Sequence, residues 1–127
     1  MRVLVVEDNP LLQKLVPAVL EKALGPVEIF AARSLEEAYA VLAHQEQPDL
    51  VLLDLGLPGH AGIDTLRRFR WKFPALPVVV FSATEDPASV RVARELGAIG
   101  YLPKSLNAEQ MVRALKNLLE GGSFFPG

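Results

Sequence analysis

The chain has 127 residues, of which half are hydrophobic and 22% are charged, and its formal net charge is −2. This length suits one compact domain and is too short for two, and the composition is that of an ordinary globular protein. A small negative charge gives no general attraction to nucleic acid or to anionic membranes, so we expect this chain to bind neither directly. The chain has no cysteine, which excludes disulfides, thiolate chemistry and Cys-ligated zinc.

The N-terminal sequence argues against secretion. The apolar run Val3–Val6 meets the acidic pair Glu7-Asp8 too soon for a signal peptide. No apolar stretch approaches the roughly 20 residues that are needed to cross a bilayer. We therefore expect a cytoplasmic protein, and the lack of cysteine fits a reducing compartment.

The first half of the chain alternates between strand and helix patterns. An unbroken apolar run at Leu4–Val6 predicts a buried strand, and pairs of apolar residues that recur every four positions over 11–24 predict an amphipathic helix. A weaker strand pattern follows at Val27–Ala31. A second helical pattern at Leu35–Leu42 begins after Ser34, which is a suitable N-cap.

The second half repeats this alternation. The runs Leu50–Leu53 and Val78–Phe81 predict two further buried strands, and Gly100–Pro103 predicts a shorter one. Asp86-Pro87 is typical of a helix start between the last two strands. The final helix begins after Asn107, with Gln110 three residues later in a capping box.

Five strand–helix units in sequence predict an α/β fold in which helices cover both faces of a parallel sheet. We expect residues 1–127 to form one flavodoxin-like, doubly wound domain with strand order 2-1-3-4-5.

Polar residues follow the predicted strands at the edge where ligands bind in open α/β sheets. Acids end the first strand at Glu7 and Asp8, and Asp54 directly follows the third. Taken alone, Asp8 is more simply interpreted as a loop or cap residue. Asp54 is a stronger signal, because the loop after it contains Gly56 and other residues that let backbone approach a ligand closely.

The predicted strand order brings three carboxylates into one pocket. At about 4 Å and an effective dielectric of about 20, each like-charged pair is destabilised by up to roughly 4 kcal/mol, so positive charge must be present. Lys104, after the fifth strand, supplies one charge, and oxygen ligands favour Mg²⁺ for the rest. A carboxylate can form an aspartyl phosphate, and the hydroxyl of Ser82 can donate to a phosphoryl oxygen.

An ordered set of residues at consecutive strand ends carries a family resemblance. Each piece is a weak signal, but the ordered set is highly specific and covers essentially the whole chain. The chain resembles the receiver domain of two-component response regulators in Glu7, Asp8, Asp54, Pro58, Gly62, Ser82, Ala83, Tyr101, Leu102, Pro103 and Lys104.

The resemblance implies a role for each matching residue. Asp54 would accept a phosphoryl group from a sensor histidine kinase, with Lys104 and Ser82 assisting. Mg²⁺ would be held by Glu7, Asp8, Asp54 and the backbone carbonyl of Gly56. Ser82 and Tyr101 would form a switch pair, in which the hydroxyl turns toward the phosphoryl group and the ring moves inward. Such a domain is not a classical enzyme and has at most self-phosphorylation and self-dephosphorylation activity.

The stretch 97–105 and the ending 121–126 further resemble regulators of the LuxR/NarL type, which carry a helix-turn-helix output domain. That domain is not expected within this chain, so the chain is either a fragment, which we favour, or a stand-alone receiver in a phosphorelay or binding role. The expected output surface comprises the helix after Asp86, the strand 100–103 and the helix after Asn107. This surface would contact an output domain, a partner protein or a second copy of the chain.

Other conspicuous residues have simpler interpretations. We expect His44 and His60 to be surface residues, because neither belongs to a spaced ligand set. Trp71 and Phe73 are expected to pack at the end of the third helix, and Ser123–Phe125 to be a frayed end.

Two rival functions remain. One is an Mg²⁺-dependent hydrolase that works through an aspartyl phosphate, although Gly56 stands where such enzymes normally carry a second acid. The other is a degenerate receiver that acts only as a binding module.

Overall fold

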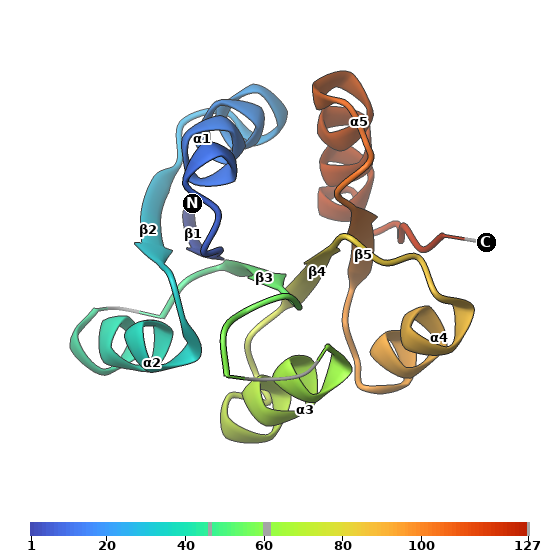
Figure 1. Cartoon of the computed structure of the whole chain (residues 1–127). Coiled ribbons are helices and arrows are strands. Elements are labelled where there is room, and N and C mark those ends of the chain that lie inside the picture. The colour runs from blue at the N-terminus through green and yellow to red at the C-terminus, as the bar shows by residue number, and fades with distance from the viewer. Residues whose placement is uncertain (46, 60–61, 127) are drawn as a thin grey trace.

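The computed structural model describes residues 1–45, 47–59 and 62–126. Strands and helices alternate along these residues, and Figure 1 shows them in chain order from blue to red. The elements are β1 (Arg2–Val6), α1 (Pro10–Leu24), β2 (Glu28–Ala32), α2 (Leu35–His44), β3 (Leu50–Asp54), α3 (Ile63–Lys72), β4 (Val78–Ser82), α4 (Pro87–Glu95), β5 (Gly100–Pro103) and α5 (Ala108–Leu119).

The strands form one parallel sheet in the order β2-β1-β3-β4-β5, which confirms the predicted flavodoxin-like topology. Helices α1 and α5 cover one face of the sheet, and α2, α3 and α4 cover the other (Figure 1). The strand order reverses at β1, between β2 and β3. The carboxyl ends of β1 and β3 therefore lie side by side at the switch point, where ligands bind in this class of sheet.

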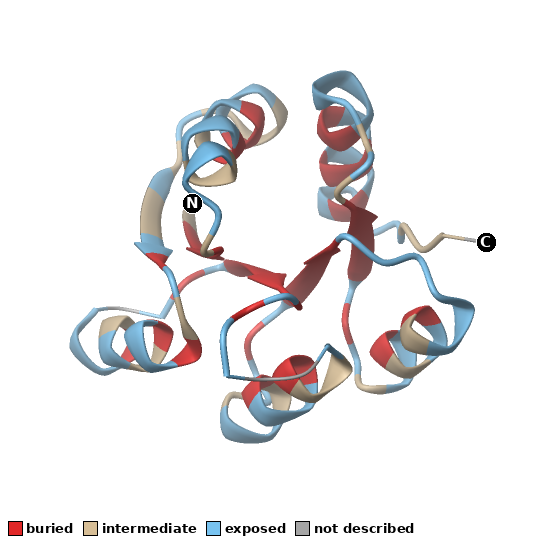
Figure 2. Ribbon diagram, viewed as in Figure 1, coloured by how far each residue is buried: buried red, intermediate tan, exposed pale blue. Residues whose placement is uncertain are grey.

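The central strands are buried (Figure 2), and their side chains alternate between two hydrophobic clusters. In β1, Leu4 and Val6 belong to the cluster beneath α2, α3 and α4, whereas Val3 and Val5 belong to the cluster beneath α1 and α5. This period of two is the geometry of a strand. Burial of each such side chain contributes about 1.5–3 kcal/mol, so the central strands are a rigid base for the loops at their ends.

The predicted helix starts are confirmed at α2 and α5. The hydroxyl of Ser34 accepts the N–H of Glu37 at 3.1 Å. Asn107 and Gln110 form the reciprocal capping box, with both hydrogen bonds at 2.8 Å. Asp86 is the N-cap residue of α4, although its side chain makes no capping hydrogen bond.

The prediction that Trp71 packs at the end of the third helix is wrong. Trp71 is 86% exposed, whereas Phe73 packs against Tyr39 and Phe69 with ring centroids 5.7 and 5.3 Å away. Phe69 is the buried residue of this turn, and a residue two positions later lies on a different side of a helix.

The prediction that Ser123–Phe125 is a frayed end is also wrong. Phe124 forms a parallel bridge with Gly100, and its carbonyl accepts the N–H of Tyr101 at 2.7 Å. The physical reason is that β5 is an edge strand with backbone groups left to pair.

His44 is exposed, as expected, and His60 lies outside the described residues. Within the described part of the chain, no helix is both long and apolar enough to span a bilayer.

Candidate functional site

Strand register brings the charged residues of the site together. Val6 pairs with Leu53, so the next residues along, Glu7 and Asp54, are neighbours at the ends of β1 and β3. Side-chain alternation also directs Glu7 and Asp54 toward the same face, that of α1 and α5. Lys104, just after β5, is also directed toward this face, because Leu102 two residues earlier lies in the α1–α5 cluster.

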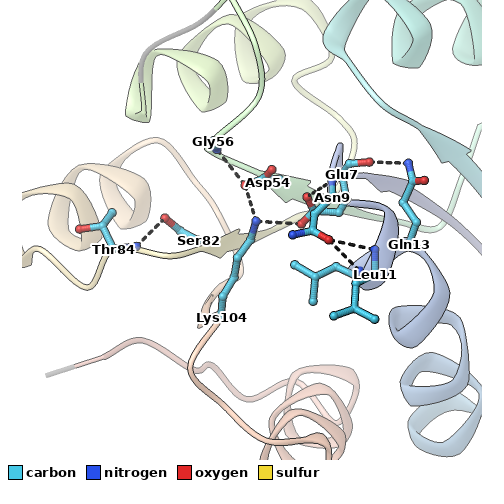
Figure 3. A network of polar contacts seen from close by, with 10 residues as sticks. Glu7, Asn9, Leu11, Gln13, Asp54, Gly56, Ser82, Thr84 and Lys104 are labelled. Carbon is cyan, nitrogen blue, oxygen red and sulfur yellow. Dashed lines mark hydrogen bonds and ion pairs between the residues drawn. The ribbon is translucent and has the colours of Figure 1, made fainter.

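The ammonium of Lys104 lies between the two carboxylates (Figure 3). Its Nζ atom is 2.9 Å from Glu7 Oε1 and 3.0 Å from Asp54 Oδ1. Glu7 and Asp54 are each 1% exposed, and the Lys104 side chain is 19% exposed. One partly buried cation therefore neutralises only one of two buried anions, which leaves the cluster with net negative charge.

The protonation equilibria reflect this imbalance. Burial raises the pKa of Glu7, and the charge of Asp54 adds to the rise, although the N–H of Asn9 and the ammonium of Lys104 oppose it. Burial alone would lower the pKa of Lys104, but its hydrogen bonds to Glu7 and Asp54 and their negative charges outweigh burial and raise that pKa. Lys104 is thus held in its charged form by its two partners.

The arrangement of oxygens fits a hard divalent cation. Glu7, Asp8 and Asp54 each offer a carboxylate oxygen, and these oxygens all lie within 4.8 Å of one another. Asp54 Oδ2 is buried and has no hydrogen-bond partner among the described residues. A buried carboxylate oxygen without a donor is destabilising unless a cation compensates it. The site opens into a cavity of about 580 Å³ whose lining includes Asp8, Asp54, Ser82 and Lys104.

The loop between β1 and α1 is held in place by two amides that the sequence reasoning missed. The backbone N–H of Asn9 donates to Glu7 Oε2 at 2.9 Å, and the Asn9 side chain caps α1 through the N–H of Leu11. Gln13 Nε2 donates to the Glu7 carbonyl at 2.6 Å. An asparagine before Pro10 is an N-cap signal that could have revealed the first contact. Gln13 gives no sequence signal, because glutamine is common on helix surfaces.

Gly56 fixes the orientation of Asp54 on the other side. Its N–H donates to Asp54 Oδ1 at 2.8 Å. A Cβ atom at this position would lie 3.4 Å from the same oxygen. The absence of a side chain therefore keeps the approach to Asp54 open. The direction of the Gly56 carbonyl toward a metal is not tested by these contacts, so that role stays a prediction.

Ser82 and Tyr101 lie on the other face of the sheet, under α4. Ser82 is buried, with 3% of its surface exposed, and its hydroxyl accepts a hydrogen bond from the N–H of Thr84 at 3.2 Å. Tyr101 is fully buried, and its hydroxyl donates to the Thr84 carbonyl at 2.8 Å. The ring therefore already occupies the inward position that the resemblance assigned to the switched form. Both switch residues contact the backbone of Thr84, in the loop that leads to α4.

Burial raises the pKa of Tyr101, although a hydrogen bond with the Ser82 hydroxyl opposes the rise, and burial also raises the pKa of Tyr39. These are the two tyrosines of the chain. A raised native pKa means that the folded protein holds the phenolic proton more tightly than the unfolded chain. The associated stability is fully present below the usual pKa of 10.0 and is lost as pH rises through the native values.

We therefore expect tyrosinate absorbance to appear at higher pH in the folded protein than in urea, where both rings titrate normally. Spectrophotometric titration with and without urea measures this difference. A native titration curve that coincides with the curve in urea would contradict the burial of the two hydroxyls.

Comparison with known proteins agrees with this geometry. The sequence profile described as the response regulator receiver domain matches residues 3–116. This chain belongs to the response regulator receiver family. The acidic pocket formed by Glu7, Asp8 and Asp54 is consistent with the phosphoacceptor site of a receiver domain, and such acidic clusters are typical of the family's metal site.

Named relatives of this receiver domain include a DNA-binding regulator. The nitrate/nitrite response regulator NarL of Escherichia coli K12 is 34% identical over 94% of this chain and 55% of its own length. A LuxR family DNA-binding response regulator from Silicibacter pomeroyi is 31% identical, with a TM-score of 0.82 over 99% of this chain and 97% of that structure. The Mn²⁺-bound form of response regulator Rcp1 is 29% identical, with a TM-score of 0.74 over 91% and 88%. The receiver spans a little over half the length of the curated relatives that it matches first.

Proposed function

We propose that Asp54 is the phosphoacceptor of a two-component signalling pathway and takes a phosphoryl group from a sensor histidine kinase. The observation that carries this proposal is the asymmetry of the Asp54 carboxylate. Oδ1 is held by the Lys104 ammonium and the Gly56 N–H, while Oδ2 has no hydrogen-bond partner among the described residues. Asp54 lines the open cavity, so an incoming group can approach this carboxylate from that side while Lys104 and Gly56 hold Oδ1.

The transfer forms a bond between an Asp54 carboxylate oxygen and phosphorus and breaks the bond between phosphorus and the donor histidine nitrogen, whose imidazole then takes a proton from solvent. Lys104 stabilises negative charge on the phosphoryl oxygens, because its ammonium already lies 3.0 Å from Asp54 Oδ1. Ser82 lines the same cavity, and its hydroxyl can donate to another phosphoryl oxygen.

Mg²⁺ is the proposed cofactor. Glu7, Asp8, Asp54 and the Gly56 backbone carbonyl would hold it, and the clustered carboxylate oxygens support this assignment. When bound, the ion would neutralise charge on the phosphoryl oxygens. The Mn²⁺-bound structure of Rcp1 supports divalent cation binding by this class of domain.

We further propose that α4, β5 and α5 form the output surface. Its exposed side chains are of mixed sign, which suits a polar protein contact better than a phosphate backbone. These charged residues are Arg91, Arg94, Glu95, Glu109, Arg113 and Lys116. The output is transcription through a helix-turn-helix domain outside residues 1–127, as the DNA-binding relative from Silicibacter pomeroyi suggests. A stand-alone phosphorelay or binding role, or a homodimer, is the alternative use of this surface.

Mapping of the modified residue tests the proposal. After incubation with acetyl phosphate and Mg²⁺, we expect a single base-labile adduct in the peptide that contains Asp54. The Asp54→Asn variant should carry none, because an amide is not nucleophilic. The Asp64→Asn variant is the matched control, since Asp64 lies on α3 and is bonded to Arg68. Phosphate on a serine or threonine instead would rule the proposal out.

A further inference from the structure

The C-terminal residues beyond α5 return along the open edge of the sheet. Gly121 has a positive φ of 85°, and the next residue, Gly122, donates its N–H to the Asn117 carbonyl at 2.9 Å. A Cβ atom at Gly122 would lie 2.5 Å from Asn117 Oδ1, so a side chain there would displace the Asn117 amide. The Asn117 side-chain amide then donates to the Ser123 carbonyl at 2.9 Å. These contacts direct the chain toward β5, and Figure 1 shows it beside that strand.

The segment Ser123–Pro126, here called the tail, pairs with β5 in parallel. Gly100 and Phe124 are bridge partners, and the Tyr101 N–H donates to the Phe124 carbonyl at 2.7 Å. By strand alternation Phe124 lies on the α5 side of the edge, where it lines a groove with Leu106 and Ala114.

The next tail residue, Phe125, lies on the same face as Tyr101. It is half-buried and packs against the cluster that contains Tyr101, Val90 and Ala93. The Arg94 guanidinium lies 4.4 Å from the centre of the Phe125 ring, and Pro126 lines a hollow with Val90 and Arg94 of α4. The tail therefore contacts α4, β5 and α5 together.

We propose that docking of the tail on β5 is coupled to the inward position of the Tyr101 ring, so that phosphorylation of Asp54 tightens the docking. This inference rests on the proposed function of Asp54. The direct link is that one residue, Tyr101, binds the tail through its backbone and the Thr84 loop through its hydroxyl.

The coupling has a steric basis on the side of the tail. Gly100 and Phe124 are bridge partners in parallel, so the next residues, Tyr101 and Phe125, lie beside each other. Arg94 covers the Phe125 ring. A Tyr101 ring that left the interior toward the sheet edge would enter the space that Phe125 occupies. The docked tail therefore favours the inward ring, and the inward ring leaves room for the tail.

The coupling reaches Asp54 through Ser82 and Thr84. The Ser82 hydroxyl accepts the Thr84 N–H, and the Tyr101 hydroxyl donates to the Thr84 carbonyl. If Ser82 turns its hydroxyl toward a phosphoryl group, the Thr84 loop loses that contact and is then held through the Tyr101 hydroxyl, which favours the inward ring. Since coupling between two binding events is reciprocal, weakening the tail must also weaken binding of a phosphoryl mimic.

The test uses the full chain, with beryllofluoride and Mg²⁺ as the phosphoryl mimic. We expect the mimic to slow hydrogen exchange of the Tyr101 amide by at least about fivefold, and Phe125→Ala to weaken apparent beryllofluoride affinity by a similar factor. Phe125→Tyr should restore the affinity. Trp71→Ala is the control, because this exposed aromatic residue on α3 contacts neither site, and it should change neither measurement.

Two results would overturn the inference while leaving the proposed function intact. In one, beryllofluoride perturbs the amides around Asp54 but leaves Tyr101 exchange unchanged. In the other, Phe125→Ala binds the mimic as tightly as the parent chain does. If the parent chain binds no beryllofluoride and takes no phosphoryl group from acetyl phosphate, the proposed function fails and the coupling fails with it.

Discussion

Replacing Lys104 with methionine is expected to destabilise the metal-free protein by about 3 kcal/mol at neutral pH, because it leaves two buried carboxylates without their shared cation. Both partners, Glu7 and Asp54, are 1% exposed and lie within 3.0 Å of the ammonium, so the loss of Lys104 removes their nearest positive charge. Methionine keeps most of the side-chain volume, so the loss reports the charge rather than a cavity.

This loss should shrink as the pH falls. Burial already raises the pKa of Glu7 above 4.5, and removal of Lys104 raises it further. Between the unfolded and native pKa values the folded state binds more protons than the unfolded chain, so a lower pH stabilises the fold in that window. Adding Glu7→Gln to the variant should recover stability at neutral pH, since one buried anion is then gone.

Urea denaturation in the presence of a chelator measures the effect, and Lys14→Met is the matched control because Lys14 is exposed on α1. A Lys104 variant as stable as this control at neutral pH would show that the buried cluster does not depend on its cation. The Lys104 variant should also take up phosphoryl groups more slowly, because the ammonium next to the acceptor is lost.

Magnesium is expected to raise the thermal stability of the parent chain. An ion that binds only the folded state at about ten times its Kd adds roughly 1.4 kcal/mol, which is a few degrees in Tm for a domain of this size. The source of the gain is relief of repulsion among Glu7, Asp8 and Asp54, whose oxygens lie within 4.8 Å of one another only in the fold.

Asp8→Asn should abolish most of this response, since it removes a ligand that is more accessible than Glu7 or Asp54. Glu21→Gln, an exposed change on α1, should respond as the parent does. Melting curves at constant ionic strength, with Mg²⁺ or with sodium chloride alone, separate binding from general screening. An equal rise in Tm for the Asp8 variant would place the ion elsewhere.

The sheet and the convergence of the site could be predicted because they depend on local patterns. Apolar runs such as Leu50–Leu53 fix the buried strands, and the residue after each run must lie at the same edge of a parallel sheet. The predicted strand order was therefore enough to predict that Glu7, Asp54 and Lys104 lie close together, as they do in the structure.

The remaining features depend on contacts that no pattern encodes. Gln13 reaches back to the Glu7 carbonyl from the end of the first turn of α1, which periodicity cannot show. Trp71 looked like a core residue by type, but its helical phase places it in solvent. The tail looked frayed because its binding partner, the edge of β5, exists only in the folded sheet.

Intact mass spectrometry after incubation with acetyl phosphate tests the central claim most directly. With Mg²⁺ present, we expect the parent chain to gain the mass of one phosphoryl group, and the gain to vanish on chelation or in the Asp54→Asn variant. A parent chain that gains no mass, or an Asp54→Asn variant that gains as much as the parent, would contradict the assignment of Asp54 as the phosphoacceptor.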